Sequence, residues 1–158
     1  MTAVLSCPRR LFRILAAAEM VTWTLLLAGM VGKYVLDAGD LPVRVGGSVH
    51  GFVFLVYALI TVVIGVDQQW PRQSIALGLA SAVIPYATVP FERSAERRGL
   101  LGDRWRLLSP GTSPDGAVER LVEAGLRRPV LAAVLGVVGV AVTFSVLLAL
   151  GPPTEWFA

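Results

Sequence analysis

The stretch Gly46–Val66, GGSVHGFVFLVYALITVVIGV, decides the fold class because it runs for 21 residues without a formal charge. A helix rises about 1.5 Å per residue, so roughly 20 apolar residues are needed to cross the hydrocarbon core of a bilayer, which is about 30 Å thick. We therefore predict that this stretch is a transmembrane helix.

Three other stretches have a similar character, namely Phe12–Tyr34, Ser74–Phe91 and Pro129–Leu150. The first is interrupted by Glu19, and the third is shorter and carries Pro85 and Pro90 near its end. These stretches predict an all-α fold, a four-helix transmembrane bundle. The expected domains are a three-span membrane core (1–91), an Arg-rich extramembrane loop with a short amphipathic helix (92–128), a fourth transmembrane helix (129–150) and a tail (151–158).

The composition agrees with a membrane protein and argues against several other classes. Charged residues make up 16% of the 158 residues and mean hydropathy is +0.69, whereas soluble domains carry about 25% charged residues. A net charge of +3 without a basic, aromatic-rich patch does not favour nucleic-acid binding, and a single cysteine excludes an intramolecular disulfide. Arginine in preference to lysine, with abundant Ala, Gly and Val, is typical of a high-GC bacterial gene. We expect the bacterial inner (plasma) membrane.

The long loop contains a pattern for one helix. Ser113-Pro114-Asp115 resembles a helix start, with a serine cap, proline at the first position and an acid in the first turn. Apolar residues then recur at helical spacing: Val118, Leu121, Val122 and Leu126. Two interpretations stay open, a helix lying on the membrane surface and an ordinary helix that covers the end of the bundle.

Arginines give conflicting signals for orientation, because basic residues stay preferentially in the cytoplasm. With four spans, the long loop and the first loop share one side and hold ten basic residues, against four on the other side. This count favours a cytoplasmic loop 92–128 with both termini outside. The opposite orientation, with the N-terminus in the cytoplasm, is favoured by three arginines at the start of the first span: Arg9, Arg10 and Arg13.

Polar residues inside the spans form one stripe on each of three helices. Glu19 shares a face with Lys33 by heptad steps, and an acid at membrane depth should face protein rather than lipid. The second stripe includes His50, Tyr57 and Thr61. The third consists of residues seven positions apart: Ser74, Ser81 and Thr88. We expect these stripes to pack against each other.

Simple antiparallel packing predicts two separate polar layers. Glu19 should lie level with Thr61 and Ser81, whose hydroxyls would suit a neutral, protonated carboxyl. His50 should lie level with the end of the first span and with Tyr86–Thr88. Glu19 and His50 would then be about 16 Å apart along the membrane normal, so a direct pair between them is disfavoured. Glu19 can be read as a proton- or ligand-binding group or as a polar contact that holds helices together.

Small residues four positions apart mark faces where helices can approach closely. The candidate packing residues are Gly47 and Gly51 in the second span, Gly78 and Ala82 in the third, and Ala132 and Gly136 in the fourth. Such pairs indicate contact between helices without identifying the partner helix.

The run Val49–Tyr57, VHGFVFLVY, resembles the signature of a bacterial family of small integral membrane proteins, domain of unknown function 3817. Supporting matches over about residues 10–95 are Phe12-Arg13, Glu19, Lys33-Tyr34, Trp70, Pro85 and Glu92-Arg93. Tyr86-Ala87 and Pro90 depart from the family pattern. The resemblance implies three membrane helices and no established activity, with the long loop and the fourth span outside it.

These features favour a non-enzymatic membrane protein, an accessory or scaffold subunit of a larger membrane complex. No catalytic triad spacing, phosphate-binding loop or metal-ligand cluster is visible, and no cofactor is evident. The expected partners are membrane lipids and other membrane protein subunits or a second copy. The alternative is a small binding or transport protein that holds a proton, lipid or quinone at the Glu19 and His50 layers.

Overall fold

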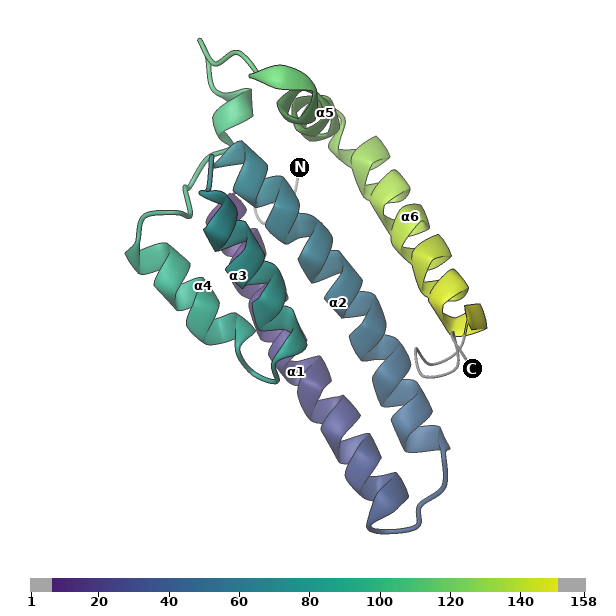
Figure 1. Ribbon diagram of the computed structural model, residues 1–158. Helices are drawn as coiled ribbons and strands as arrows, with labels where there is room; N and C mark the ends of the chain where they lie inside the picture. The colour runs from purple at the N-terminus through teal and green to yellow at the C-terminus, as the bar shows by residue number, and fades with distance from the viewer. Residues whose placement is uncertain (1–6, 151–158) are drawn as a thin grey trace.

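The structure is a computed structural model that describes residues 7–150, all of whose regular elements are helical. The predicted tail 151–158 lies outside the described residues. In chain order the elements are α1 (Pro8–Tyr34), α2 (Leu41–Asp67), α3 (Arg72–Val83), α4 (Thr88–Arg97), a 3₁₀ turn η1 (Arg106–Leu108), α5 (Gly116–Arg127) and α6 (Pro129–Leu150). Figure 1 shows α1 and α2 as a long antiparallel hairpin, with α3 and α4 on one side and α6 along the other side of α2.

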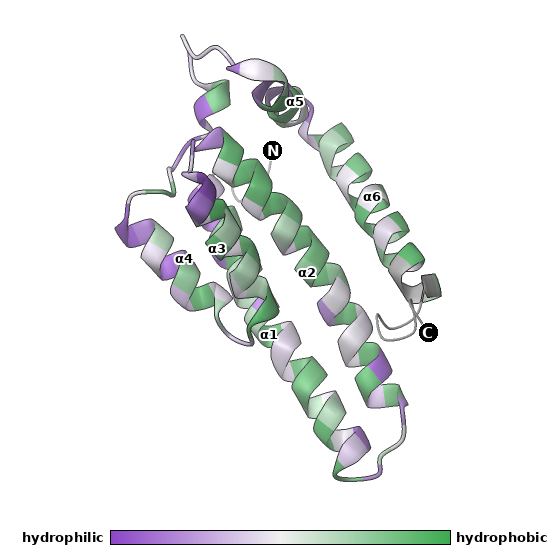
Figure 2. Cartoon of the chain, in the orientation of Figure 1, coloured by the Kyte–Doolittle hydropathy of each residue, from purple (hydrophilic) through white to green (hydrophobic). Residues whose placement is uncertain are grey.

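Three helices, α1, α2 and α6, are long and apolar enough to cross a membrane. Their length and composition meet the requirement of a bilayer about 30 Å thick. Figure 2 shows these helices as mainly hydrophobic, with hydrophilic residues gathered near one end of the molecule and on α4. The prediction of a helical membrane protein therefore agrees with the structure, whereas a bundle of four spans is not confirmed.

The predicted third span, Ser74–Phe91, is wrong as a single helix because it breaks between Val83 and Thr88. Proline disfavours the helical conformation of the residue before it, and Ile84, which precedes Pro85, is extended. Tyr86 then adopts a positive φ of 65°. The 12 residues of α3 rise only about 18 Å, so α3 is too short to cross.

Instead α3 and α4 form a hairpin whose two open ends meet. The Trp70 indole Nε1, just before α3, donates to the Leu100 carbonyl oxygen at 2.6 Å, just beyond α4. At the tip, the Thr24 hydroxyl of α1 donates to the Tyr86 hydroxyl at 3.5 Å. The Trp23 indole donates to the Ala82 carbonyl oxygen at the end of α3 at 3.2 Å, which satisfies a backbone group that lipid could not.

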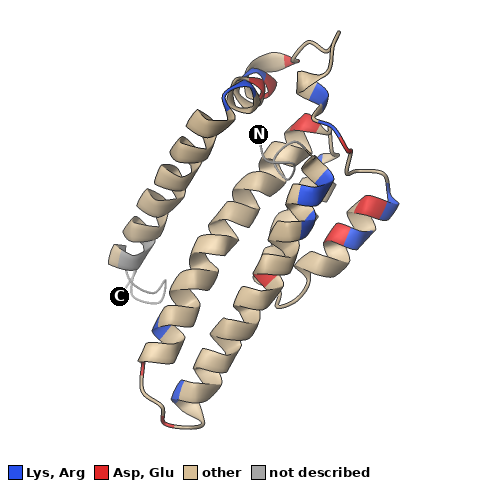
Figure 3. Cartoon of the chain, turned by 180° about the vertical axis from the view of Figure 1, so that it is seen from behind, with Lys and Arg blue, Asp and Glu red and all other residues tan. Residues whose placement is uncertain are grey.

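This reversal brings most charges to one end of the molecule. We call it the charged end; it comprises the start of α1, the end of α2, the open end of the α3–α4 hairpin, residues 98–115 and α5 (Figure 3). Arg13 at the start of α1 binds Glu92 and Glu96 of α4, at 3.2 and 2.7 Å. At the opposite end, the Lys33 ammonium lies 2.9 Å from Asp40 and holds the pKa of that carboxyl below its usual range.

The predicted placement of the N-terminal arginines opposite the long loop is consequently wrong. It followed from an even number of crossings, and the chain has three candidate spans because α3 and α4 turn back. The backbone N–H of Arg9 donates to the Gly102 carbonyl oxygen at 3.3 Å, which joins the start of α1 directly to the long connection.

The connection after α4 is an ordered cap and not an open loop. The fully buried Asp67 carboxylate accepts the backbone N–H groups of Arg106 and Leu107, both at 3.0 Å. The Arg106 guanidinium pairs with Glu119 of α5, and together with the Asp115 backbone N–H it holds the pKa of Glu119 below its ordinary value. We call these three residues, Asp67, Arg106 and Glu119, the Asp67 latch, because their contacts hold α5 against the end of α2.

A helix, α5, lies where the amphipathic helix was predicted; it begins at Gly116 with Asp115 at its N-cap position, two residues after the predicted cap and first helical residue. Val118 and Leu121 on its apolar face are exposed, whereas Leu126 packs against the core. Exposed apolar residues on a helix at the charged end suit a position on the membrane surface. After α5 the chain turns at Arg128 into α6.

Candidate functional site

Two glycines set how α1 lies against α2. A Cβ on Gly46 would lie 2.8 Å from the Leu25 carbonyl oxygen, and a Cβ on Gly29 would lie 2.7 Å from the Pro42 carbonyl oxygen. Both obstacles are backbone atoms, so any side chain at these positions would push the helices apart. This close contact places His50, one turn beyond Gly46, level with Thr22 in the middle of α1.

The result is a buried polar cluster of Glu19, Thr22 and His50. The His50 Nδ1 atom lies 3.6 Å from Glu19 Oε2, and the Thr22 hydroxyl lies 3.1 Å from His50 Nδ1 and 3.3 Å from Glu19 Oε2. Glu19 is 0% exposed and His50 8%. The threonine hydroxyl thus bridges a carboxyl and an imidazole that do not hydrogen-bond directly.

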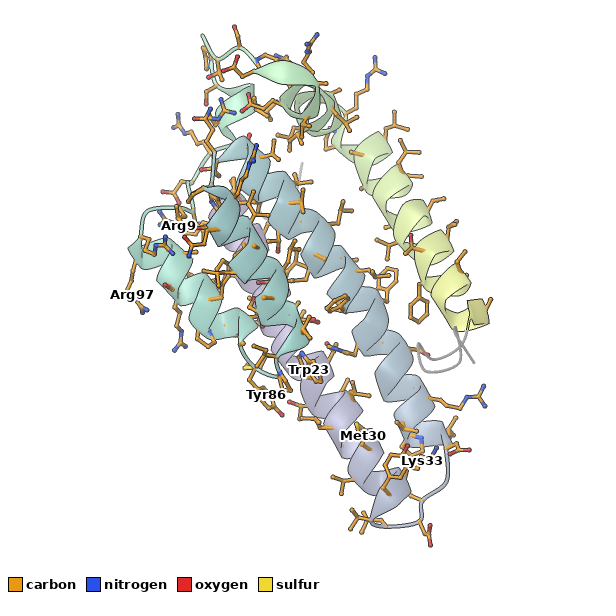
Figure 4. The ribbon with its side chains drawn as sticks, in the orientation of Figure 1. Arg9, Trp23, Met30, Lys33, Tyr86 and Arg97 are labelled. Carbon is orange, nitrogen blue, oxygen red and sulfur yellow. The ribbon has the colours of Figure 1, made fainter. Side chains whose placement is uncertain are left out.

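Aromatic side chains cover the imidazole. The ring centroids of Trp23 and His50 are 4.3 Å apart, and those of His50 and Phe54 are 6.3 Å apart. Trp23 also donates to the end of α3, so it connects the polar cluster to the tip of the α3–α4 hairpin. Figure 4 shows Trp23 and Tyr86 near the middle of the molecule, far from Lys33 at one end and Arg9 at the other.

The predicted separation of Glu19 and His50 by about 16 Å is wrong. That distance assumed that the second span begins at Gly46 and that Asp37–Val45 is a loop. In the structure α2 already begins at Leu41, with Pro42 in its first turn, where a missing N–H costs nothing. α2 therefore begins five residues earlier than predicted, and the backbone contacts of Gly46 with Leu25 and of Gly29 with Pro42 bring His50 to the level of Thr22.

The remaining polar residues of the three stripes lie beside this cluster, in a grouping that matches neither predicted layer. The Tyr57 hydroxyl lies 3.1 Å from the Ser81 hydroxyl, and the Thr61 hydroxyl donates to the Tyr57 carbonyl oxygen at 2.8 Å. The Thr88 hydroxyl, at the start of α4, donates to the Ala16 carbonyl oxygen of α1 at 3.0 Å. All four side chains are buried, so the three stripes do pack inward. Lys33 does not join them.

The predicted packing residues lie at helix contacts. A Cβ on Gly78 would meet Thr61 at 2.8 Å, one on Gly51 would meet Phe144 of α6 at 2.8 Å, and one on Gly136 would lie 3.5 Å from Leu59. Gly47 faces Leu26 of α1, Ala132 lies near Gly125, and Ala82 is fully buried. The glycines with the tightest backbone contacts, Gly29 and Gly46, were missed because they belong to no small-residue pair within one helix.

Thr22 is the member of the polar cluster that sequence reasoning missed. It lies three residues after Glu19, a spacing that puts two side chains on one helical face, and this signal could have found it. Asp67 was also missed, because it was assigned to a loop between spans.

Chemically, the cluster brings together the carboxyl and the imidazole that lie deep in the spans. Between Arg13 and Lys33 of α1, and between Arg44 and Asp67 of α2, Glu19 is the one acidic and His50 the one histidine residue; 129–150 of α6 carries neither. No group of three or more His, Cys, Asp or Glu residues that could hold a metal ion occurs among the described residues. A carboxyl and an imidazole can hold and exchange protons.

Comparison with known proteins now places the chain in a family. Residues 9–97 match the family described as "Domain of unknown function (DUF3817)". The chain belongs to this family. The match contains α1 to α4, and hence every member of the Glu19–Thr22–His50 cluster, and it ends before η1, α5 and α6. The resemblance noted from the VHGFVFLVY run is thereby confirmed, and α6 is an addition to the DUF3817 segment.

A protein of Streptomyces coelicolor, whose name describes it as a membrane protein, is 39% identical over 93 residues. The aligned segment is 58% of this chain but only 11% of the Streptomyces protein. The chain therefore spans about a ninth of the length of that relative. No solved structure matches this chain.

Proposed function

We propose that this DUF3817 protein is a non-enzymatic accessory module that docks on larger membrane proteins. The observation that carries the proposal is the Streptomyces relative, in which a related segment makes up 11% of a much longer chain. In that relative the segment is joined to a much longer chain, so we expect the DUF3817 segment to pack against other membrane-spanning segments in this protein as well.

The state of α6 supports this proposal. Only 6% of the residues in Pro129–Val146 are buried inside the structure, against 28% of the most apolar 18 residues of α2. An open apolar groove remains between the two helices, and it is lined by Leu55, Leu59, Leu135, Gly136, Gly139, Val140 and Thr143. In a bilayer, helices associate through such small-residue surfaces. We infer that the outward face of α6 contacts a partner helix.

The charge distribution supports an orientation with the charged end in the cytoplasm. Twelve of the fourteen basic residues lie at that end, and the two others, Lys33 and Arg44, lie near the 35–40 loop. Because the N-terminal arginines and the long connection are now on one side, the two signals that conflicted in the sequence agree. We propose that residues 7–13 and 98–128 face the cytoplasm and that 35–40 faces outward.

This orientation can be tested with the chain's single cysteine, Cys7. A membrane-impermeant maleimide should label Cys7 only after cells are broken, because the start of α1 is cytoplasmic. A Cys7→Ser, Ala38→Cys variant should be labelled in intact cells, since Ala38 is exposed in the outward loop. The reverse pattern would invert the orientation, and labelling of both sites in intact cells would contradict the three-span arrangement.

The accessory role can be tested by photo-crosslinking in living cells. A photo-reactive residue replaces Val138 on α6, which is 53% exposed and does not line the groove toward α2, or, as a matched control, Leu25 on α1, which is 49% exposed. We expect the Val138 probe to yield an adduct with a longer membrane-spanning protein and the Leu25 probe to yield much less. Adducts at neither position, with recovery of an isolated monomer in several mild detergents, would refute the accessory role.

A second candidate function is favoured by one observation, the contact between Glu19 and His50 inside the membrane. The alternative expected from the sequence was binding or transport of a proton, lipid or quinone. Because Glu19 is fully buried and Trp23 and Phe54 lie against His50, a lipid or quinone could reach Glu19 only if the helices moved. A proton needs no such space, so we propose the proton as the bound species.

A further inference from the structure

Inside the spans the chain combines one acid with one imidazole and leaves one oxygen without a partner. Glu19 Oε1 is buried and makes no hydrogen bond with the described residues. A buried carboxylate oxygen that lacks a donor loses its hydration without compensation, and this penalty is larger for a charged group than for a neutral one. A site of this kind is most stable when it carries no net charge.

We infer that Glu19 and His50 together form a binding site for a single proton, with the Thr22 hydroxyl as the bridge between them. This inference rests on the second candidate function and specifies its ligand and stoichiometry. One proton shared by the two groups gives a neutral site in either arrangement, as carboxyl with imidazole or as carboxylate with imidazolium. Zero or two protons would leave a net charge at membrane depth, where an ion is expensive.

Thr22 can convert one arrangement into the other without loss or gain of a proton. In the first arrangement the Glu19 carboxyl donates its proton to the Thr22 oxygen while the Thr22 O–H donates to His50 Nδ1. Transfer along both bonds leaves Glu19 as carboxylate, Thr22 as a neutral hydroxyl and His50 as imidazolium. The Thr22 oxygen lies 3.1 Å from His50 Nδ1 and 3.3 Å from Glu19 Oε2; the second distance exceeds the roughly 2.5–3.0 Å usual for O–H···O, so the two oxygens must approach each other before the proton moves.

Other titratable groups near the pair are already engaged. Tyr57 of α2 shares a hydrogen bond with Ser81 of α3. Glu92 of α4 is bound by Arg13 of α1 at 3.2 Å. Tyr86, at the tip of the α3–α4 hairpin, accepts from Thr24. The charge of Glu92 is thus compensated by a neighbour, which leaves Glu19 and His50 to balance each other.

The proton count can be measured because His50 is the chain's one histidine. Imidazole ¹⁵N labelling of the full-length protein in lipid nanodiscs therefore gives the resonances of a single side chain, and NMR distinguishes neutral imidazole from imidazolium. Infrared spectroscopy of the same sample detects the C=O stretch of a protonated carboxyl. The Glu19→Gln variant assigns that band, and Glu92→Gln is the control, being a buried acid at the charged end.

At neutral pH we expect one of two results, each equal to one proton. In the first result His50 is imidazolium, and no C=O band of a protonated carboxyl depends on Glu19; the Glu19→Gln variant then makes the imidazole neutral. In the second result His50 is neutral, and the C=O band of the protonated Glu19 carboxyl disappears in Glu19→Gln. Glu92→Gln should change neither signal. A neutral imidazole without such a band, or an imidazolium together with it, would overturn the inference. Either outcome leaves the crosslinking result of the accessory role unaffected.

Thr22 is a positioning residue, and its variants give a separate readout. In Thr22→Val the proton count should stay at one, while the His50 Nδ1 resonance shifts because its hydrogen bond is lost. Thr22→Ser should restore that resonance, since serine keeps the hydroxyl. An unchanged Nδ1 resonance in Thr22→Val would show that the hydroxyl is not the bridge.

Discussion

Replacing Gly46 with valine is expected to destabilise the protein strongly, because α1 and α2 touch through their backbones at this position. The new Cβ would lie 2.8 Å from the Leu25 carbonyl oxygen and 3.2 Å from the Leu26 Cα. Both are backbone atoms of a helix, so they can move only if α1 moves. Overpacking of this kind costs about 3 kcal/mol. The displaced α2 would also carry His50 away from Thr22.

Thermal unfolding in mild detergent, followed by circular dichroism, measures this effect. The matched control is Gly139→Val in α6, where a Cβ would meet nothing within 4 Å. We expect the control to unfold near the wild-type temperature and Gly46→Val well below it. The His50 ¹⁵N resonances should shift in Gly46→Val and not in the control. Equal melting temperatures for the two variants would mean that Gly46 does not set the register.

Replacing Asp67 with alanine is expected to release the cap from the end of α2. The fully buried carboxylate accepts two backbone N–H groups, from Arg106 and Leu107, as well as the Gln68 side-chain amide. The two backbone donors would lose their acceptor, whereas the Gln68 amide would keep the Arg104 carbonyl oxygen. At about 1–3 kcal/mol for each backbone group, a total loss of about 2–6 kcal/mol is expected. The Arg106–Glu119 contact would weaken at the same time, because the backbone of Arg106 would no longer be held.

Limited proteolysis of residues 98–115 and thermal unfolding test this prediction. Asp67→Ala should be cut much faster than wild type, whereas Asp67→Asn, which keeps one carbonyl acceptor, should be intermediate. Glu123→Ala is the control, since it removes a charge from the same end but breaks only an exposed i,i+4 pair with Arg127, a contact of at most about 0.5 kcal/mol. If Asp67→Ala and Glu123→Ala behaved alike, Asp67 would not hold the cap.

The periodicity of polar residues predicted which side chains are buried, but not which of them touch. Tyr57, Thr61 and Ser81 were assigned to buried faces from their spacing, and they are buried, because a bilayer leaves polar side chains no alternative to protein partners. The same spacing could not say which stripe meets which at a given level. That depends on where each helix begins and on which backbones touch. Because α2 begins at Leu41 and Gly46 lies against Leu25, the predicted level of His50 on α1 was wrong by about two turns.

The α3–α4 hairpin shows that hydropathy alone does not predict whether an apolar segment crosses the membrane. Pro85 and Pro90 were noticed near the end of the third stretch, yet apolar character outweighed them in the assignment of a fourth span. Hydropathy reports that a segment avoids water, and a segment can do so by crossing lipid or by packing against other helices. Only the contacts of Trp23 with Ala82 and of Trp70 with Leu100 distinguish the two cases.

Taken alone, the order of residues was sufficient for the membrane class, the long helices α1, α2 and α6, the amphipathic α5 and the DUF3817 family, because each depends on local composition or on a short run. The number of crossings, the side on which the N-terminal arginines lie, the Asp67 latch and the meeting of Glu19 with His50 were decided by tertiary structure. These features depend on backbone contacts between distant segments, such as Gly46 against Leu25, and a shift of a few ångströms there changes which side chains touch.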